Sequence, residues 1–85
     1  MKNAIPLNHL VLNQCARVQG LNFAGNERRR LLDLGFREGS IVRPVLASPS
    51  GNPMAYQVCG AIVALRACDS RRIAVMPVER DGGAC

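Results

Sequence analysis

Aromatic side chains are scarce in this chain of 85 residues, which has no tryptophan, one tyrosine and two phenylalanines. Proteins that bind single-stranded nucleic acid stack bases on several aromatic rings, and this chain has too few rings for such a platform. Phe36 and Tyr56 also occupy positions that favour a core. We therefore expect a protein partner and no nucleic acid, and a nucleic-acid-binding small barrel is the weaker alternative.

Groups that could carry out catalysis are also few. His9 is the only histidine, and no carboxylate lies near it in the sequence to orient it as a base for a nucleophile. The glycines do not form a phosphate-binding loop, because no strand, glycine loop and helix unit ends in Gly-Lys-Ser or Gly-Lys-Thr. We expect no enzymatic activity and no cofactor.

The four cysteines, Cys15, Cys59, Cys68 and Cys85, include no Cys-x-x-Cys pair. Closely spaced pairs are typical of structural zinc sites, so this spacing argues against a metal site. We expect reduced thiols, because disulfides are rare in the cytosol. The alternative is a metal-responsive protein in which these cysteines and His9 bind Fe²⁺ or Zn²⁺ directly.

No segment is typical of a signal peptide or of a membrane span. Pro6 and Asn8 interrupt the N-terminal apolar residues before a signal sequence could form. The longest stretch of low charge, 58–65, is far shorter than the roughly 20 residues of a transmembrane helix. We expect a cytoplasmic protein with a single domain over residues 1–85, in which 79–85 form a flexible tail.

Basic residues outnumber acidic ones by eleven to six, the net charge is +5, and all the basic residues except Lys2 are arginines. Arginine makes planar, bidentate contacts with carboxylates and phosphates, which favours an anionic partner. Arg28, Arg29 and Arg30 form the densest cluster. They are either a docking surface for such a partner or the solvated face of a helix, where exposed ion pairs contribute only about 0–1 kcal/mol each.

The segment 25–35 is predicted to form a helix. Arg and Leu are strong helix formers, and Asn26 or Gly25 is placed to cap the N-terminus. Gly35 is predicted to stop the helix in a left-handed conformation, with Phe36 folding back on the last turn. Leu31 and Leu34 share one face of this helix, while Arg28 points away from that face.

The rest of the chain predicts short strands separated by turn residues. Strands are expected at 16–19, 40–46, 54–59, 61–65 and 73–76. The loop 48–53 is rich in turn residues, so the strands on either side of it are expected to form a hairpin. Five short strands with one early helix favour the all-β class and a small closed barrel.

The segment 58–65 is apolar on both faces of its predicted hairpin. If Val63 and Leu65 point inward, strand alternation places Ile62 and Ala64 outward. An outward Ile62 is a candidate contact for a partner or for a second copy, although single exposed isoleucines are common. The candidate partner-binding residues are Arg28, Arg29, Ile62 and Arg66.

Several motifs occur in a recognisable order. The first is Arg30-Leu31-Leu32-Asp33-Leu34-Gly35-Phe36 followed by Gly39, and the later ones are Pro49, Gly51-Asn52-Pro53, Gly60 and Ala64-Leu65-Arg66. This ordered set, which spans 7–78, resembles the ferrous iron transport protein A (FeoA) family. The four cysteines and the acidic tail are not hallmarks of that family.

The resemblance implies a small SH3-like β-barrel with mainly β structure and one or two short helices. It also implies a regulatory subunit of ferrous iron uptake that works through protein–protein interaction. The implied partner is the ferrous iron permease, a membrane protein with a cytosolic GTPase domain, and neither catalysis, a cofactor nor direct membrane insertion is required. The same module occurs fused to metal-dependent transcriptional repressors.

Overall fold

The computed structural model describes residues 4–78. In chain order the elements are strand β1 (Ile5–Pro6), 3-10 helix η1 (Leu7–His9), β2 (Ala16–Leu21), helix α1 (Gly25–Leu34), β3 (Ile41–Ala47), β4 (Met54–Val58), β5 (Ala61–Leu65), helix α2 (Ala67–Ser70) and β6 (Ile73–Pro77). The described chain is therefore mainly β structure, as predicted.

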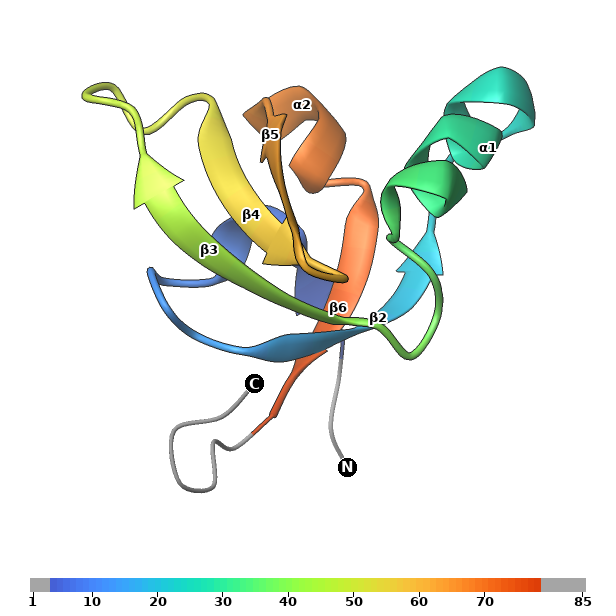
Figure 1. The fold of residues 1–85 in the computed structure, drawn as a ribbon, viewed down its shortest axis with the longest axis horizontal. Coiled ribbons are helices and arrows are strands. Elements are labelled where there is room, and N and C mark those ends of the chain that lie inside the picture. Colours follow the sequence, from blue (N-terminus) through green and yellow to red (C-terminus); the bar gives the residue numbers. More distant parts are fainter. Residues whose placement is uncertain (1–3, 79–85) are drawn as a thin grey trace.

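The six strands form one antiparallel sheet in the order β1-β6-β2-β3-β4-β5. The pairing register shifts between Val18 and Gly20 in β2 and between Pro44 and Leu46 in β3, and such bulges bend strands. The sheet curls around its core (Figure 1). The sheet has the curl expected of a small barrel, and among the described residues its two end strands, β1 and β5, do not pair with each other. The short helices that adjoin them in sequence, η1 and α2, contact each other instead.

Helix α1 ends as predicted but begins differently. Gly35 takes a left-handed φ of +110°, and the N–H of Phe36 donates to the carbonyl of Leu31 at 3.0 Å, which is the hydrogen bond of a Schellman motif. At the other end Ala24 occupies the N-cap position, so the prediction of Gly25 or Asn26 is wrong. Gly25 with φ +62° is already the first helical residue, and no side chain caps this end.

The strands predicted from alternation are all present, with ends shifted by at most two residues. The segment 67–70, between the last two predicted strands, forms the short helix α2. Two elements were not predicted, β1 and η1, because Pro6 and Asn8 interrupt any periodic pattern there. Pro6 has no N–H to donate, and β1 lies at an end of the sheet, where a proline is tolerated.

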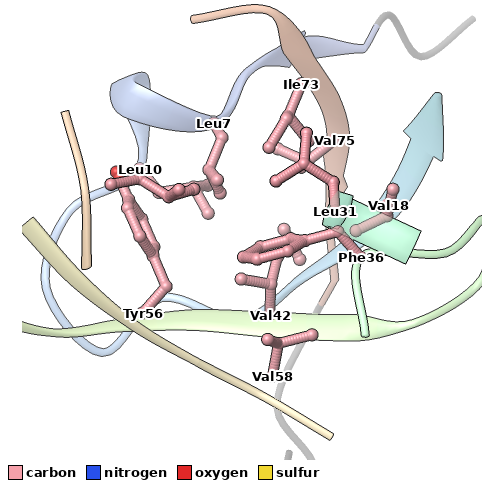
Figure 2. Close-up of a cluster of buried hydrophobic side chains, with 12 residues drawn as sticks. Leu7, Leu10, Val18, Leu31, Phe36, Val42, Tyr56, Val58, Ile73 and Val75 are labelled. Carbon is pink, nitrogen blue, oxygen red and sulfur yellow. The ribbon is translucent and has the colours of Figure 1, made fainter. Parts of the chain in front are cut away.

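The core lies inside the curl of the sheet, where side chains from η1, α1 and most strands meet (Figure 2). Phe36 and Tyr56 are 0% and 1% exposed, which confirms their assignment to the core. Leu7 and Leu10, from the unpredicted N-terminal segment, extend into the core on the side of Tyr56 (Figure 2). The predicted tail 79–85 lies outside the described residues.

Candidate interaction surface

All four residues predicted to bind a partner are exposed. Arg28 and Arg29 lie in the first half of α1, Ile62 lies on β5, and Arg66 follows β5 as the N-cap of α2. Ile62 is 62% exposed, and it is one of four large apolar side chains that are exposed among residues 4–78. The structure therefore places these residues on the outside of the molecule, on or next to the two elements that flank a groove, although none of the four lines that groove.

Strand β5 is held by a tight turn and follows the predicted alternation. It pairs with β4 in regular register from Val58↔Ala61 to Met54↔Leu65. Leu65 is buried and Val63 is partly buried, whereas Ile62 and Ala64 are exposed. The prediction that Ile62 points outward is confirmed.

A groove of about 150 Å³ runs between α1 and β5. Its lining combines apolar side chains with two acidic residues and one arginine, and it consists of Phe23, Glu27, Arg30, Leu31, Leu34, Val63, Ala64, Leu65 and Asp69. The sequence pattern identified the apolar face of α1 but not this groove, because the groove depends on the angle between α1 and the sheet. The sequence analysis also did not identify Phe23 as a residue of the groove. Its position just before the predicted helix was the only feature of the sequence that pointed to it.

The arginines of the described chain fall into two groups. Arg37 and Arg72 donate to the backbone carbonyls of Leu32 and Asn22 at 3.2 and 3.1 Å, and Arg72 also lies 4.4 Å from the centre of the Phe23 ring. Such contacts give these two arginines structural roles. Arg28 and Arg29, by contrast, take part in none of the side-chain hydrogen bonds formed within residues 4–78. Their guanidinium groups are available to an anionic partner.

Arg43 has a different environment on the outer face of the sheet. Its guanidinium donates a hydrogen bond to the side-chain oxygen of Gln57 on the neighbouring strand. Gln57 in turn lies opposite Ile62, so the three residues form one row across β3, β4 and β5. The Nε of Arg43 is buried and has no partner among the described residues.

The residues of the metal-binding alternative that the structure describes are His9, Cys15, Cys59 and Cys68. Cys59 in the β4–β5 turn and Cys68 on α2 are free thiols, and His9 is exposed at the end of η1. Cys15 is buried and disulfide-bonded, so the expectation of reduced thiols is wrong at this position. Cys85 lies outside the described part of the chain. Within residues 4–78, no three His, Cys, Asp or Glu residues form a group that could hold a metal ion.

Tyr56 is a buried side chain that carries a polar hydroxyl group. Burial raises the pKa of Tyr56 above its ordinary value of 10.0, while a hydrogen bond with Ser70 acts in the opposite direction. Ser70 is itself only 1% exposed. This pair links β4 to α2 inside the molecule and faces the core, so it contributes to stability and not to a surface site.

None of the helices among residues 4–78 is long and apolar enough to cross a membrane.

Comparison with known proteins identifies the family. The model of the FeoA domain matches residues 5–77, which is nearly the whole described chain. The chain belongs to the FeoA family. The resemblance noted in the motifs from Arg30 to Arg66 is thereby confirmed. No curated protein matches the chain.

Solved structures agree with this assignment. Stenotrophomonas maltophilia FeoA complexed with zinc is 35% identical, has a TM-score of 0.72, and is aligned over 84% of this chain and 88% of its own. That protein is described as a prokaryotic SH3 domain protein with a suggested activating role in ferrous iron transport. The FeoA fold of the present chain is accordingly SH3-like.

Two solution structures show the same fold at lower identity. Iron(II) transport protein A from Clostridium thermocellum is 27% identical with a TM-score of 0.82, over 87% of this chain and 46% of its own. FeoA protein from Chlorobium tepidum is 26% identical with a TM-score of 0.83, over 93% of this chain and 75% of its own. The chain therefore spans less than half the length of the Clostridium thermocellum protein.

Proposed function

We propose that the protein is a non-enzymatic, cytosolic accessory protein of ferrous iron uptake, which docks on the cytosolic, GTPase-bearing part of the ferrous iron permease. Membership of the FeoA family supports the link to ferrous iron transport. The activating role suggested for the Stenotrophomonas maltophilia relative supports a regulatory task. Within residues 4–78 the polar groups suited to chemistry are dispersed, which supports binding as the activity.

One observation carries the docking proposal. The exposed arginines of α1 and the exposed apolar residues of β5 lie on the two elements that line the groove. Positive charge beside an apolar strip suits a protein partner that is acidic around an apolar contact. Charges at the rim of such an interface accelerate association more than they increase affinity.

The proposal is tested with the purified cytosolic domain of the ferrous iron permease from the same organism. The double variant Arg28→Glu/Arg29→Glu should associate more slowly and bind about tenfold more weakly at low ionic strength. The difference should shrink as salt is added, because exposed charges are screened. Stopped-flow association and titration calorimetry measure the two quantities.

A matched control distinguishes an effect of the charges at Arg28 and Arg29 from an effect of the net charge of the protein. Arg17→Glu/Arg71→Glu makes the same change in net charge at exposed positions outside α1, and it should change the affinity by less than about threefold. If the two double variants weaken binding equally, only net charge matters and α1 is not the docking helix. If the unmodified chain does not bind the permease domain, the proposed function is wrong.

A further inference from the structure

Strand β5 is an open edge of the sheet. It is the last strand in the order β1-β6-β2-β3-β4-β5, and among residues 4–78 it pairs only with β4. All five of its residues, Ala61–Leu65, are uncharged and apolar, and its register contains no bulge. Sheet edges usually carry a charge, a proline or a bulge that prevents another strand from pairing. β5 carries none of these, whereas the opposite edge, β1, has only two residues and one of them is Pro6.

The tight turn determines which backbone groups of β5 are free. Cys59 and Gly60 both have positive φ, +51° and +78°, as the two central residues of a type I′ turn do. Such a two-residue hairpin hydrogen-bonds the pair that closes it, Val58↔Ala61, and every second pair beyond it. The N–H and C=O groups of Ile62 and Ala64 therefore point away from β4. No other hydrogen bond formed within residues 4–78 reaches these two residues.

The groove follows this free edge. Val63 and Ala64 face opposite sides of the sheet, because they are neighbours in a strand, yet both line the groove. A groove bordered by both residues must pass along the edge of β5 and not over one face. Leu31 and Leu34 of α1 form the opposite wall. A single extended backbone placed there would pair with Ile62 and Ala64 and bury alternate side chains against α1.

We propose that β5 accepts an extended segment of the permease's cytosolic part as an additional strand in the groove between β5 and α1. The segment pairs through its backbone with Ile62 and Ala64. It has apolar side chains at alternate positions, an acidic residue beside Arg30 or Arg66, and polar or basic residues where Glu27 and Asp69 line the groove. This inference rests on the proposed function, and it adds the mode of binding and the chemistry of the bound segment.

Charge and shape favour a partner's segment over a second copy of this chain. Each copy has a net charge of +5, so two copies repel one another, whereas an acidic segment is attracted. Helix α1 also flanks the edge of β5 across the groove. A single strand would need only the space beside β5, whereas the sheet of a second copy would bring its own α1 up to the same groove.

Amide hydrogen exchange tests the pairing in the unmodified protein. When the permease's cytosolic domain is added at saturation, the amides of Ile62 and Ala64 should exchange at least about tenfold more slowly. The amides of Val63 and Leu65 already donate within the β4–β5 ladder and should change much less. This contrast between neighbouring residues distinguishes strand pairing from general burial of the surface.

A pair of variants at one position tests the same point. Ala64→Pro removes the outward N–H and leaves the ladder to β4 intact, since prolines are tolerated on edge strands. It should weaken binding by about tenfold, and Ala64→Val, which keeps the N–H and adds similar bulk, by less than about threefold. The circular dichroism spectrum and melting temperature establish that each variant is folded, and the exchange experiment stands even if Ala64→Pro is not.

Each other outcome overturns the inference in a distinguishable way. If the permease domain binds but the exchange of Ile62 and Ala64 is unchanged, the proposed function stands and strand addition is wrong. If Ile62 and Ala64 are already protected in the protein alone, in proportion to its concentration, the occupant is a second copy. If the permease domain does not bind, the proposed function and the inference both fail.

Discussion

Gly35, at the C-terminal end of α1, packs closely against Cys59 in the β4–β5 turn. The Sγ of Cys59 lies 3.5 Å from the carbonyl oxygen of Gly35, to which it donates a weak hydrogen bond. A Cβ on residue 35 would lie only 3.0 Å from the Cβ of Cys59. Both residues have left-handed backbones, with φ of +110° and +51°. This contact joins the C-terminal end of α1 to the turn that precedes β5, the two elements that flank the groove.

Gly35→Ala should destabilise the protein for two independent reasons. A left-handed backbone at an L-residue lowers the free energy of unfolding by about 1–2 kcal/mol. The new methyl group would also collide with Cys59. Overpacking of this kind typically adds about 1–3 kcal/mol. Urea denaturation followed by circular dichroism measures the total loss.

Gly39→Ala is the control for the backbone contribution alone. Gly39 also has a positive φ, +93°, but a Cβ there meets no atom within 4 Å. The free energy of unfolding of Gly39→Ala should therefore fall only by the cost of the left-handed backbone, about 1–2 kcal/mol. Equal losses for Gly35→Ala and Gly39→Ala would show that the contact with Cys59 has no energetic weight.

Cys59→Asn should stabilise the hairpin. Asn followed by Gly is strongly preferred in type I′ turns, because Asn tolerates positive φ better than other residues with a side chain. Cys59 precedes Gly60 at this position with φ +51°, so the substitution should add about 0.5 kcal/mol. Thermal unfolding of Cys59→Asn beside Cys59→Ser separates the turn preference from the loss of the thiol. If the two variants melt at the same temperature, Asn at position 59 does not stabilise this turn and the prediction is wrong.

Local patterns were sufficient to predict most elements of the fold. The end of α1 follows from Gly35 alone, because the left-handed stop is a property of that residue and its neighbours. Likewise, the apolar run 61–65 predicted a strand, and the alternating direction of side chains in a strand places Ile62 outward once Val63 and Leu65 point inward. The cap at Asn26 failed because Gly25 lets the helix begin earlier than side-chain preferences suggest.

Features that depend on distant parts of the chain could not be predicted. The groove requires Leu34 and Val63 to face each other across elements 29 residues apart, and no local pattern encodes that angle. The free edge of β5 depends on the strand order of the whole sheet. Leu7 was missed for the same reason, because η1 is too short to show a period and is held by tertiary packing.

Leu7→Ala should be strongly destabilising although Leu7 lies near the N-terminus. Its side chain is 0% exposed and packs in the core shown in Figure 2. Truncation of a buried leucine to alanine costs about 2–5 kcal/mol, as transfer free energy and cavity add. Leu12→Ala is the matched control, because Leu12 is 48% exposed, and it should lose less than about 0.5 kcal/mol. A small loss for Leu7→Ala in urea denaturation would mean that the N-terminal segment is not part of the cooperative unit.

Stability should fall at alkaline pH through Tyr56. Burial raises the pKa of Tyr56 in the folded protein, with the hydrogen bond to Ser70 acting in the opposite direction, while the unfolded chain keeps the ordinary value of 10.0. The folded state therefore holds the phenolic proton more tightly than the unfolded state. The contribution of protonated Tyr56 to the free energy of unfolding is fully present below pH 10.0. It is lost as the pH rises through the pKa that Tyr56 has in the folded protein.

Tyr56→Phe isolates this effect, because the chain has only one tyrosine and no tryptophan. The variant loses the hydrogen bond to Ser70, so it should be about 1 kcal/mol less stable at neutral pH. Above pH 10.0 its stability should decline less steeply than that of the unmodified protein, since no phenol has to ionise. Ultraviolet absorbance of tyrosinate follows Tyr56 directly, and its midpoint in the folded protein should lie above that in denaturant. If both midpoints coincide, the Tyr56 hydroxyl is in contact with solvent and the β4–α2 link is open.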